Sequence, residues 1–280
     1  MPIKNYIKRG ITYIIKGIPQ KNVTASITYS SPSERLKGKN IIITGGGRGL
    51  GFSMAKKFVE EGANVLIAGR NEDILKKSAE AIGCLYLQLD VQSIASFESF
   101  IKHADEILGG VNCLVNNAGI SLHEKSFFDV TPESFDAQFN TNLKGAYFLT
   151  QRFIKYCNKS KVAGTKDILF ISSETSTTVD VLPYGLTKAA LNSLVQGLAY
   201  EFVNAGFRIN AVAPGVTFSD MIGKVKDDNL YCEYNVTERF YEPEEVAEVA
   251  CFLLSDVSNS LNGQVLVCNE GKTINARWKL

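Results

Sequence analysis

From residue 39 onward, short apolar runs alternate with longer stretches in which apolar residues recur every three to four positions. Continuous apolar runs bounded by turn residues predict strands buried on both faces, whereas the longer spacing predicts amphipathic helices. The expected strands are Asn40–Thr44, Asn64–Ala68, Cys84–Asp90, Asn112–Asn116, Asp167–Ser172, Arg208–Ala213 and Gln264–Cys268. The expected helices span 49–61, 71–82, 93–108, 131–158, 183–205 and 243–254.

This alternation predicts one layered α/β domain. Parallel strands need long crossover connections, so we expect a doubly wound (Rossmann) seven-stranded parallel sheet with helices on both faces. The length of 280 residues and the 45% share of hydrophobic residues suit a single such domain, which we assign to residues 36–280. Ligands of these folds bind at the carboxyl ends of the strands.

Residues 1–35 precede this domain as an extension and linker. Six isoleucines recur there at three- and four-residue spacing between lysines, which predicts a basic amphipathic helix. Residues 1–21 hold five basic side chains and no acidic one, so the remainder of the chain is net negative. Such a helix can lie on an anionic membrane. The alternative is that its isoleucines pack against the domain or a second subunit.

Composition narrows the function classes. A net charge of +1, with the basic excess confined to the extension, gives no case for nucleic-acid binding. The six cysteines show no C-x-x-C pairing, and the two histidines are too few for a metal site. No run reaches the roughly 18 apolar residues of a membrane span. We therefore expect a cytoplasmic protein, with peripheral membrane contact through residues 1–21 as an option.

A glycine-rich turn, Thr44-Gly-Gly-Gly-Arg-Gly-Leu-Gly51, joins the first expected strand to the first expected helix. Glycines let the backbone approach a phosphate closely, and N–H groups at a helix N-terminus bind it. In this strand-turn-helix context the turn predicts dinucleotide binding, with a merely tight turn as the alternative. The candidate cofactor contacts are Gly45, Arg48, Gly49, Leu50 and Gly51.

The end of the second expected strand distinguishes the two nicotinamide cofactors. An acidic residue there binds the ribose 2′-hydroxyl of NAD(H), whereas an arginine accommodates the 2′-phosphate of NADP(H). The strand runs into Arg70 without a carboxylate, and Arg48 adds a second cation, so NADP(H) is expected over NAD(H). The alternative is a solvated Arg70. Asp90, followed by Val91, is a candidate contact to the adenine amino group or a turn residue.

Two further features carry the expected chemistry. Tyr184 and Lys188 are four positions apart at the start of an expected helix, which places the phenol and the ammonium on one face. A fixed cation lowers a tyrosine pKa from its usual value of about 10 and makes the phenol a usable acid or base. Ser172 and Ser173 end a buried strand at the edge where a substrate carbonyl would lie.

Six motifs follow one another along the chain: Gly45-x-x-x-Gly49-x-Gly51, Asn116-Asn-Ala-Gly119, Asn142 within Asn140-Thr-Asn-Leu, Ser172-Ser173, Tyr184-x-x-x-Lys188 and Pro214-Gly215. In order and spacing they resemble the short-chain dehydrogenase/reductases over about residues 36–271. The resemblance is strongest to the single-domain branch that includes 3-oxoacyl-carrier-protein reductases and hydroxysteroid dehydrogenases. It implies an NADP(H)-dependent oxidoreductase that acts on a small-molecule ketone or secondary alcohol.

The resemblance also implies roles for single residues. Tyr184 would be the general acid in ketone reduction and the base in alcohol oxidation. Lys188 would lower the tyrosine pKa and hold the nicotinamide ribose, and Ser173 would hydrogen-bond the substrate oxygen. Asn142, through a helix irregularity, would hold a water linking Lys188 to solvent. Besides Tyr184 and Lys188, the implied cofactor contacts are Asn117, Ala118, Gly119, Pro214, Gly215 and Thr217.

The resemblance further implies a homodimer or homotetramer built on the helices at 131–158 and 183–205, and a substrate loop over 218–239. The sequence departs from the family's pattern at three points. Only eleven positions separate Ser173 from Tyr184, so Ser172 stays an alternative catalytic serine. Asn269-Glu-Gly271 replaces the usual Asp-Gly-Gly, and the extension is additional. The rival function is a non-catalytic NADP(H)-binding sensor or scaffold docked through the extension.

Overall fold

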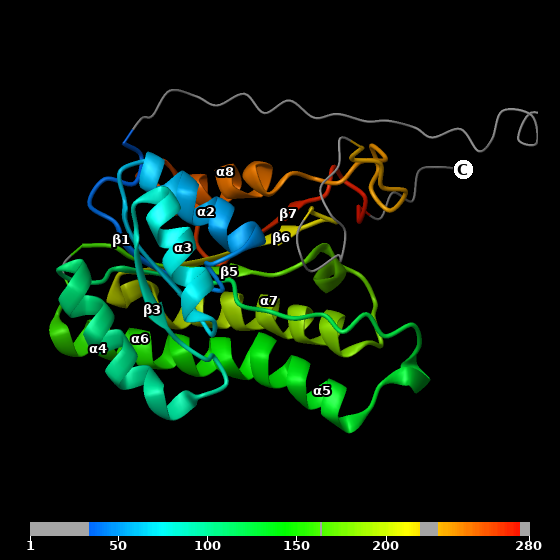
Figure 1. The fold of residues 1–280 in the computed structure, drawn as a ribbon, viewed down its shortest axis with the longest axis horizontal. Coiled ribbons are helices and arrows are strands. Elements are labelled where there is room, and N and C mark those ends of the chain that lie inside the picture. Colours follow the sequence, from blue (N-terminus) through cyan, green and yellow to red (C-terminus); the bar gives the residue numbers. More distant parts are fainter. Residues whose placement is uncertain (1–33, 163, 219–228, 275–280) are drawn as a thin grey trace, which may run out of the picture.

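The computed structural model describes residues 34–162, 164–218 and 229–274 (Figure 1). Its seven strands form one parallel sheet in the order β3-β2-β1-β4-β5-β6-β7, which confirms the predicted doubly wound fold. The strands are β1 (Asn40–Thr44), β2 (Asn64–Gly69), β3 (Leu85–Gln88), β4 (Cys113–Asn116), β5 (Lys166–Ile171), β6 (Phe207–Pro214) and β7 (Val265–Cys268).

Two helical layers cover the sheet (Figure 1). The helices are α2 (Gly49–Glu60), α3 (Glu72–Ile82), α4 (Phe97–Leu108), α5 (Pro132–Gln138), α6 (Ala146–Ser160), α7 (Pro183–Phe202) and α8 (Pro243–Leu254). Helices α2, α3 and α8 pack on one face with Ile41 and Ile43 of β1, whereas α4, α6 and α7 pack on the other face with Ile42. Alternate side chains of a strand point to opposite faces, so a continuous apolar run serves both layers.

The single helix predicted over 131–158 is three segments in the structure. Thr131 caps α5 through the backbone N–H of Ser134, and α5 ends at Gln138. A π-helical segment, η3 (Phe139–Gly145), follows before α6 begins. Gly145 lies directly on the backbone of Val91, where a Cβ would collide with the Val91 carbonyl oxygen. The wider π turn re-aims the side chains between α5 and α6, as such segments do at functional sites.

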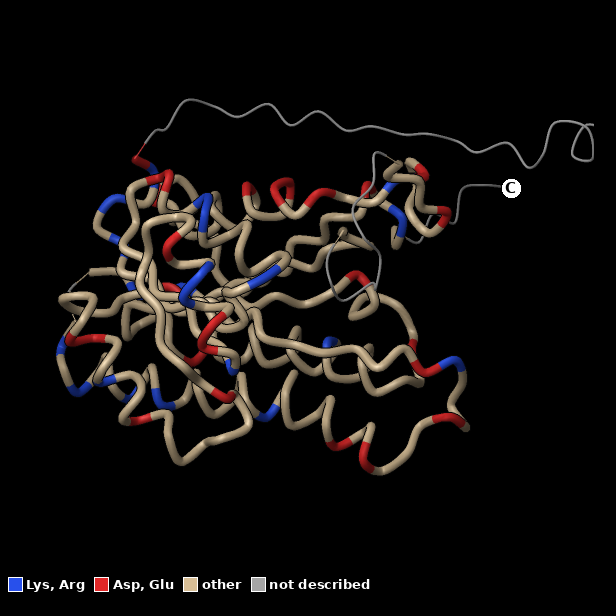
Figure 2. Tube along the Cα trace, in the orientation of Figure 1, with Lys and Arg blue, Asp and Glu red and all other residues tan. Residues whose placement is uncertain are grey.

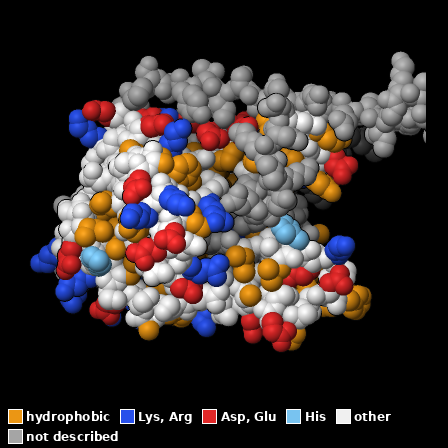
Figure 3. All heavy atoms as spheres, in the orientation of Figure 1, with side chains coloured by type: hydrophobic (Ala, Val, Ile, Leu, Met, Phe, Trp, Pro, Cys, Tyr) orange, Lys and Arg blue, Asp and Glu red, His pale blue; other side chains and the backbone are white. Residues whose placement is uncertain are grey.

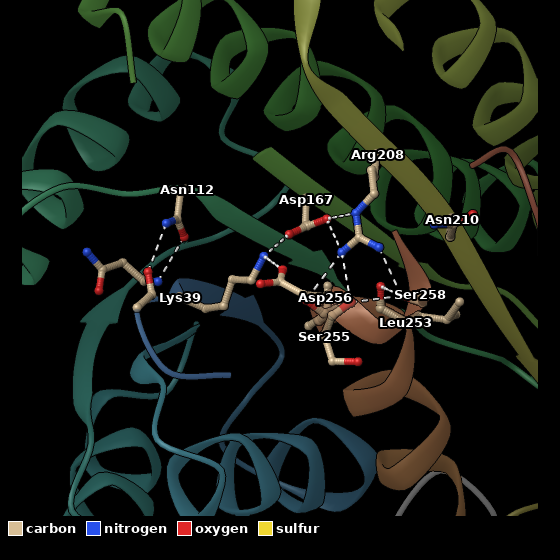
Figure 4. A network of polar contacts seen from close by, with 12 residues as sticks. Lys39, Asn112, Asp167, Arg208, Asn210, Leu253, Ser255, Asp256 and Ser258 are labelled. Atoms are coloured by element: carbon tan, nitrogen blue, oxygen red, sulfur yellow. Dashed lines mark hydrogen bonds and ion pairs between the residues drawn. The ribbon is translucent and has the colours of Figure 1, made fainter. Parts of the chain in front are cut away.

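A buried ionic network lies at the amino-terminal edge of the sheet (Figure 4). Asp167, at the start of β5, accepts from Lys39 Nζ at 2.7 Å and from Arg208 Nε at 2.8 Å. A second Arg208 nitrogen donates to Ser258 Oγ at 2.9 Å. Lys39, Asp167 and Arg208 are 7%, 1% and 7% exposed. The network therefore joins β1, β5 and β6 at the end of the sheet away from the strands' carboxyl edge.

The helix expected within residues 1–21 lies outside the described residues. Among the helices that are described, none has the length and apolar character needed to cross a bilayer. Basic and acidic residues are interspersed over both helical layers (Figure 2). Each of the six cysteines is a free thiol.

Candidate active site

Close backbone approaches shape the glycine-rich turn between β1 and α2. Gly45 has a φ of +65°, which residues with a side chain rarely adopt. A Cβ on Gly51 would collide with the carbonyl oxygen of Gly45, and one on Gly46 would lie 2.7 Å from the Ile67 side chain. Arg48, at the N-cap of α2, makes no side-chain capping bond, so the turn presents the first N–H groups of α2 at the carboxyl edge.

Asn117 supports this turn from behind. Its Nδ2 donates to the carbonyl oxygens of Thr44 and Gly45 at 2.9 and 3.1 Å. Thr44 Oγ1 accepts from the backbone N–H groups of Asn117 and Ala118, each at 3.1 Å. The family resemblance implied that Asn117 lines the cofactor. Its side chain fixes the turn to the end of β4, and the neighbouring Ala118 and Gly119 line the pocket.

A pocket of about 140 Å³ opens beside the turn, at the carboxyl ends of the central strands. Six of the expected cofactor residues line it: Gly45, Arg70, Asp90, Val91, Ala118 and Gly119. Glycines and main chain form much of the wall, so a ligand can lie close to the backbone, as a dinucleotide requires. Arg48, Gly49, Leu50 and Gly51 occupy the adjoining turn and helix start.

Charged side chains surround this pocket. Arg48 and Arg70 are both exposed, and Lys and Arg side chains stand out on the face drawn in Figure 3, over the region of α2 and α3. Asp90 Oδ1 accepts from the backbone N–H of Gln92 at 3.0 Å. The turn role considered for Asp90 is therefore present, although the residue also lines the pocket.

Ser173 and Tyr184 meet at the carboxyl edge of β5. Ser173 follows the strand, Tyr184 lies in the first turn of α7, and their side chains are hydrogen-bonded. Burial raises the pKa of the Tyr184 phenol above its ordinary value, and the hydrogen bond from Ser173 offsets part of this rise. Desolvation of the phenol is the larger of these two effects, so the pKa of Tyr184 shows no net lowering.

Lys188 lies one turn further along α7 and is 4% exposed. Its Nζ donates to the carbonyl oxygen of Ile171 at 2.8 Å and lies 5.5 Å from the centre of the Tyr184 ring. Burial lowers the pKa of Lys188 to about 8. The amino group of Lys188 can therefore gain or lose a proton at a pH near 8.

Asn142 projects from the π-helical segment η3 and is 2% exposed. Its Oδ1 accepts from the backbone N–H of Ile120 at 2.8 Å, while Nδ2 donates to the Ile120 carbonyl at 2.9 Å and to Thr187 Oγ1 at 3.2 Å. A Cβ on Gly119 would lie 3.4 Å from Asn142 Oδ1 and 3.5 Å from Lys188 Nζ. Three elements therefore meet around Gly119: the segment that follows β4, the π-helical segment η3, and helix α7.

The structure separates the two candidate serines. Ser172 Oγ donates to Asn192 Oδ1 of α7 at 2.7 Å and is directed into the protein. Ser173 bonds Tyr184 and also accepts from the backbone N–H of Thr175 at 3.3 Å. Of the two hydroxyls, Ser173 is the one placed beside the phenol.

β6 ends at Pro214, and the turn that follows, with Gly215 and Thr217, is held by residues from the segment 235–241. A Cβ on Gly215 would come within 2.6 Å of the Tyr241 ring. The buried Asn235 accepts from the backbone N–H of Val216 at 3.3 Å and donates to its carbonyl at 2.8 Å. Part of the expected substrate loop, residues 219–228, lies outside the described residues. In the part of this loop that the structure describes, Asn235 anchors the turn after β6.

Asn269, which stands where the family usually has an aspartate, bonds to a buried carboxylate next to the site. Asn269 Nδ2 donates to Glu174 Oε2 at 3.1 Å, and Lys272 Nζ donates to the other carboxylate oxygen at 2.7 Å. Glu174 directly follows Ser173 and is 6% exposed. An amide can donate to this carboxylate, whereas an aspartate there would repel it.

Three supporting residues were not foreseen from the sequence: Asn192, Asn235 and Tyr241. For Asn192 a signal exists, since it repeats the four-residue spacing of Tyr184 and Lys188 on one helix face. Asn235 and Tyr241 act across segments distant in sequence, and no local pattern marks them.

Residues 45–273 match a protein family described as enoyl-(acyl carrier protein) reductase. The chain is 31% identical over 243 residues to a 3alpha-hydroxysteroid dehydrogenase of Mediterraneibacter gnavus, covering 82% of this chain and 95% of that protein. The crystal structure of a Brucella melitensis 3-ketoacyl-(acyl-carrier-protein) reductase complexed with NADH is similar, with 28% identity and a TM-score of 0.77 over 85% of this chain and all of that one. A Burkholderia cenocepacia short-chain dehydrogenase in complex with NADP is similar at 27% identity and a TM-score of 0.73, over 85% and 99% of the two chains.

Proposed function

Since the chain belongs to the short-chain dehydrogenase/reductase family, we propose that it is an NADP(H)-dependent oxidoreductase that acts on a ketone or secondary alcohol. One observation carries this proposal: Ser173, Tyr184 and Lys188 come together beside a pocket with glycine-rich walls. A hydrogen-bonded serine and phenol next to a buried cation are suited to proton exchange with a substrate oxygen.

The residues present fit a dinucleotide. The turn from Gly45 to Gly51 would hold the pyrophosphate, because a Cβ on Gly46 or Gly51 would collide with its neighbours and the turn ends at a helix N-terminus. Asp90, Val91, Ala118 and Gly119 would line the adenosine half and the path toward Tyr184. Pro214 to Thr217 would face the nicotinamide.

The two related structures hold NADH and NADP, so relatedness favours neither cofactor. The charges of this chain favour NADP(H). Arg70 lines the pocket directly after β2, and Arg48 is exposed at the N-cap of α2. Guanidinium groups match a phosphate through forked donors, and no carboxylate at the end of β2 would repel it.

When bound, nicotinamide supplies or accepts the hydride. Tyr184 donates its phenolic proton to the substrate oxygen in reduction and removes it in oxidation, while Ser173 hydrogen-bonds the same oxygen. Lys188 provides positive charge that favours the phenolate. Asn142, next to Lys188 across Gly119, would hold the water through which the proton is exchanged with solvent.

We also propose assembly through α6 and α7, which carry exposed apolar and aromatic side chains. Tyr147 is 45% exposed on α6 and Tyr200 is 88% exposed on α7. Large exposed rings on adjacent helices suit a subunit interface. We further propose a cytoplasmic location, with residues 1–21 either in contact with an anionic membrane or packed through their isoleucines on the domain or a second subunit.

The test follows oxidation of NADPH, and in parallel NADH, against ketones that include acyl thioesters, steroids and sugars. We expect turnover with NADPH, and Tyr184→Phe should abolish it while leaving NADPH affinity nearly unchanged. A fully active Tyr184→Phe variant contradicts the mechanism. Tight NADPH binding without turnover of any ketone or alcohol points instead to the non-catalytic sensor or scaffold.

A further inference from the structure

The side-chain amide of Asn192 is bonded at both ends to the segment that carries Ser173. Its Oδ1 accepts from Ser172 Oγ at 2.7 Å, and its Nδ2 donates to Ser176 Oγ at 2.7 Å. Ser176 Oγ in turn donates to the backbone carbonyl of Ser173 at 2.5 Å. Asn192 thus holds the residue before Ser173 and, through one hydroxyl, the main chain of Ser173 itself.

The chemistry of the partners fixes the direction of this chain of hydrogen bonds. Ser176 uses its single hydroxyl proton on the Ser173 carbonyl, so toward Asn192 it can only accept. The Nδ2 group of Asn192 must therefore face Ser176, and Oδ1 is left to accept from Ser172. Both polar atoms of the amide are satisfied in one orientation.

Asn192 shares its helix face with Tyr184 and Lys188, each four positions apart. Helix α7 therefore supplies the phenol, the ammonium and the amide that fixes the serine segment. The connection between Ser173 and Tyr184 passes through the fully exposed Val179. The hydrogen bonds of Asn192 therefore link the Ser173 segment to α7 more directly than the chain between Ser173 and Tyr184 does.

We propose that Asn192 is a positioning residue, which sets the place of the Ser173 hydroxyl relative to the Tyr184 phenol. This rests on the proposed function, in which those two groups share the substrate oxygen. Asn192 acts through Ser172 and Ser176. Without Asn192 the segment keeps the bonds of Lys188 Nζ to the Ile171 carbonyl and of Ser172 Oγ to the Lys188 carbonyl, but the tie through Ser176 to the Ser173 main chain is lost. Ser173 then donates less well to the phenolate, because hydrogen bonds weaken steeply with misalignment.

The experiment compares Asn192→Leu, which removes both bonds at similar size, with Ser176→Ala, which removes the relay alone. We expect kcat for ketone reduction to fall about tenfold in each, since small misplacements at reacting groups have effects of this order. NADPH affinity and Tm should stay close to those of the wild type. The double variant should be no slower than Asn192→Leu, because both changes break one chain. Gln196→Ala and Ser193→Ala, exposed on the same helix, are the matched amide and hydroxyl controls.

A second readout separates positioning from a general structural effect. Loss of the bond from Ser173 should raise the pKa of Tyr184, so the pH dependence of alcohol oxidation should shift to higher pH in both variants. Tyrosinate absorbance, taken as the difference from each variant's Tyr184→Phe derivative, measures the same shift without substrate. Unchanged kcat, or a lower kcat and Tm with no shift in Tyr184 titration, overturns the inference. An inactive wild type refutes the proposed function, and the tyrosinate shift still decides whether Asn192 places Ser173.

Discussion

The ammonium group of Lys188 donates to the carbonyl oxygen of Ile171, 2.8 Å away, from a position that is 4% exposed. This places a titratable cation at the end of β5, beneath the residues that carry Ser173. Burial lowers its pKa to about 8 from 10.5. Proton binding by Lys188 is therefore coupled to folding as well as to the chemistry.

The first prediction is a pH-dependent stability of the wild type relative to Lys188→Met. The unfolded chain binds the Lys188 proton more tightly, so the wild type gains stability as the pH rises from about 8 to 10.5. The gain is about 3 kcal/mol over that window. Urea unfolding at a series of pH values measures it, with the exposed Lys144→Met as control. A difference between wild type and Lys188→Met that is independent of pH contradicts the lowered pKa.

The second prediction concerns the choice of cofactor. Arg70→Asp removes a cation from the pocket wall and places a carboxylate where the 2′-phosphate would bind. We expect NADPH affinity to fall about 10- to 100-fold, as for a lost charge-assisted hydrogen bond, while NADH affinity is kept or improved. Fluorescence titration with both cofactors measures this, and Lys102→Asp on α4 is the control. An equal loss of affinity for NADPH and NADH would show that Arg70 does not recognise the 2′-phosphate.

The sheet could be predicted from the sequence because each strand is marked by its own short run of apolar residues. Apolar runs such as Ile41 to Ile43 reach both helical layers, and this pattern is readable without knowing the partners. The helix irregularity at Asn142 was implied by the family resemblance, and the π-helical segment over Phe139–Gly145 confirms it. The local pattern did not show it, and the segment ends where Gly145 meets the main chain of Val91, which lies far away in sequence.

The candidate site shows the same division. Tyr184 and Lys188 were found because they share a helix face, and Gly45 and Gly51 because a glycine turn has a recognisable pattern. Ser173 could be distinguished from Ser172 only when Asn192 was seen to accept from Ser172. The burial of Tyr184, which raises the pKa of its phenol, could not be read from the sequence either, since the degree of burial is a tertiary property.

A third prediction tests the close approach inside the glycine turn. Gly51→Ala places a Cβ against the carbonyl oxygen of Gly45, so we expect destabilisation of about 1–3 kcal/mol and a marked loss of NADPH affinity. Gly197→Ala is the matched control, because Gly197 is exposed in α7 with nothing within 4 Å of its added Cβ. That change should stabilise by about 0.5–1 kcal/mol. Denaturant unfolding and cofactor titration report both effects, and a Gly51→Ala protein with unchanged NADPH affinity argues against phosphate binding at this turn.

The fourth prediction addresses the basic extension. Deleting residues 1–21 removes five basic side chains and the isoleucine pattern. If this segment docks on a membrane, sedimentation with anionic vesicles should fall, since each basic residue near such a surface contributes about 1 kcal/mol. Neutral vesicles and added salt are the controls. Unchanged vesicle binding, together with a lower Tm, would favour packing of the isoleucines on the domain or a second subunit.

The fifth prediction separates stability from activity. Asp167→Asn leaves Arg208 buried against a neutral amide and leaves Lys39 with the exposed Asp256 at 3.4 Å, so we expect a loss of about 3–5 kcal/mol in the free energy of unfolding. Asp256→Asn is the control, because its side chain is 77% exposed and an exposed pair contributes about 1 kcal/mol or less.

Asp167 and Ser173 lie near opposite ends of β5, roughly 20 Å apart at about 3.3 Å per residue. The kcat of folded Asp167→Asn should therefore equal that of the wild type at a temperature well below its lowered Tm. Urea unfolding and initial rates on the same samples measure the two quantities. A stable variant would show that the cations do not depend on Asp167, whereas a lower kcat in fully folded protein would mean that the amino edge of the sheet influences the site.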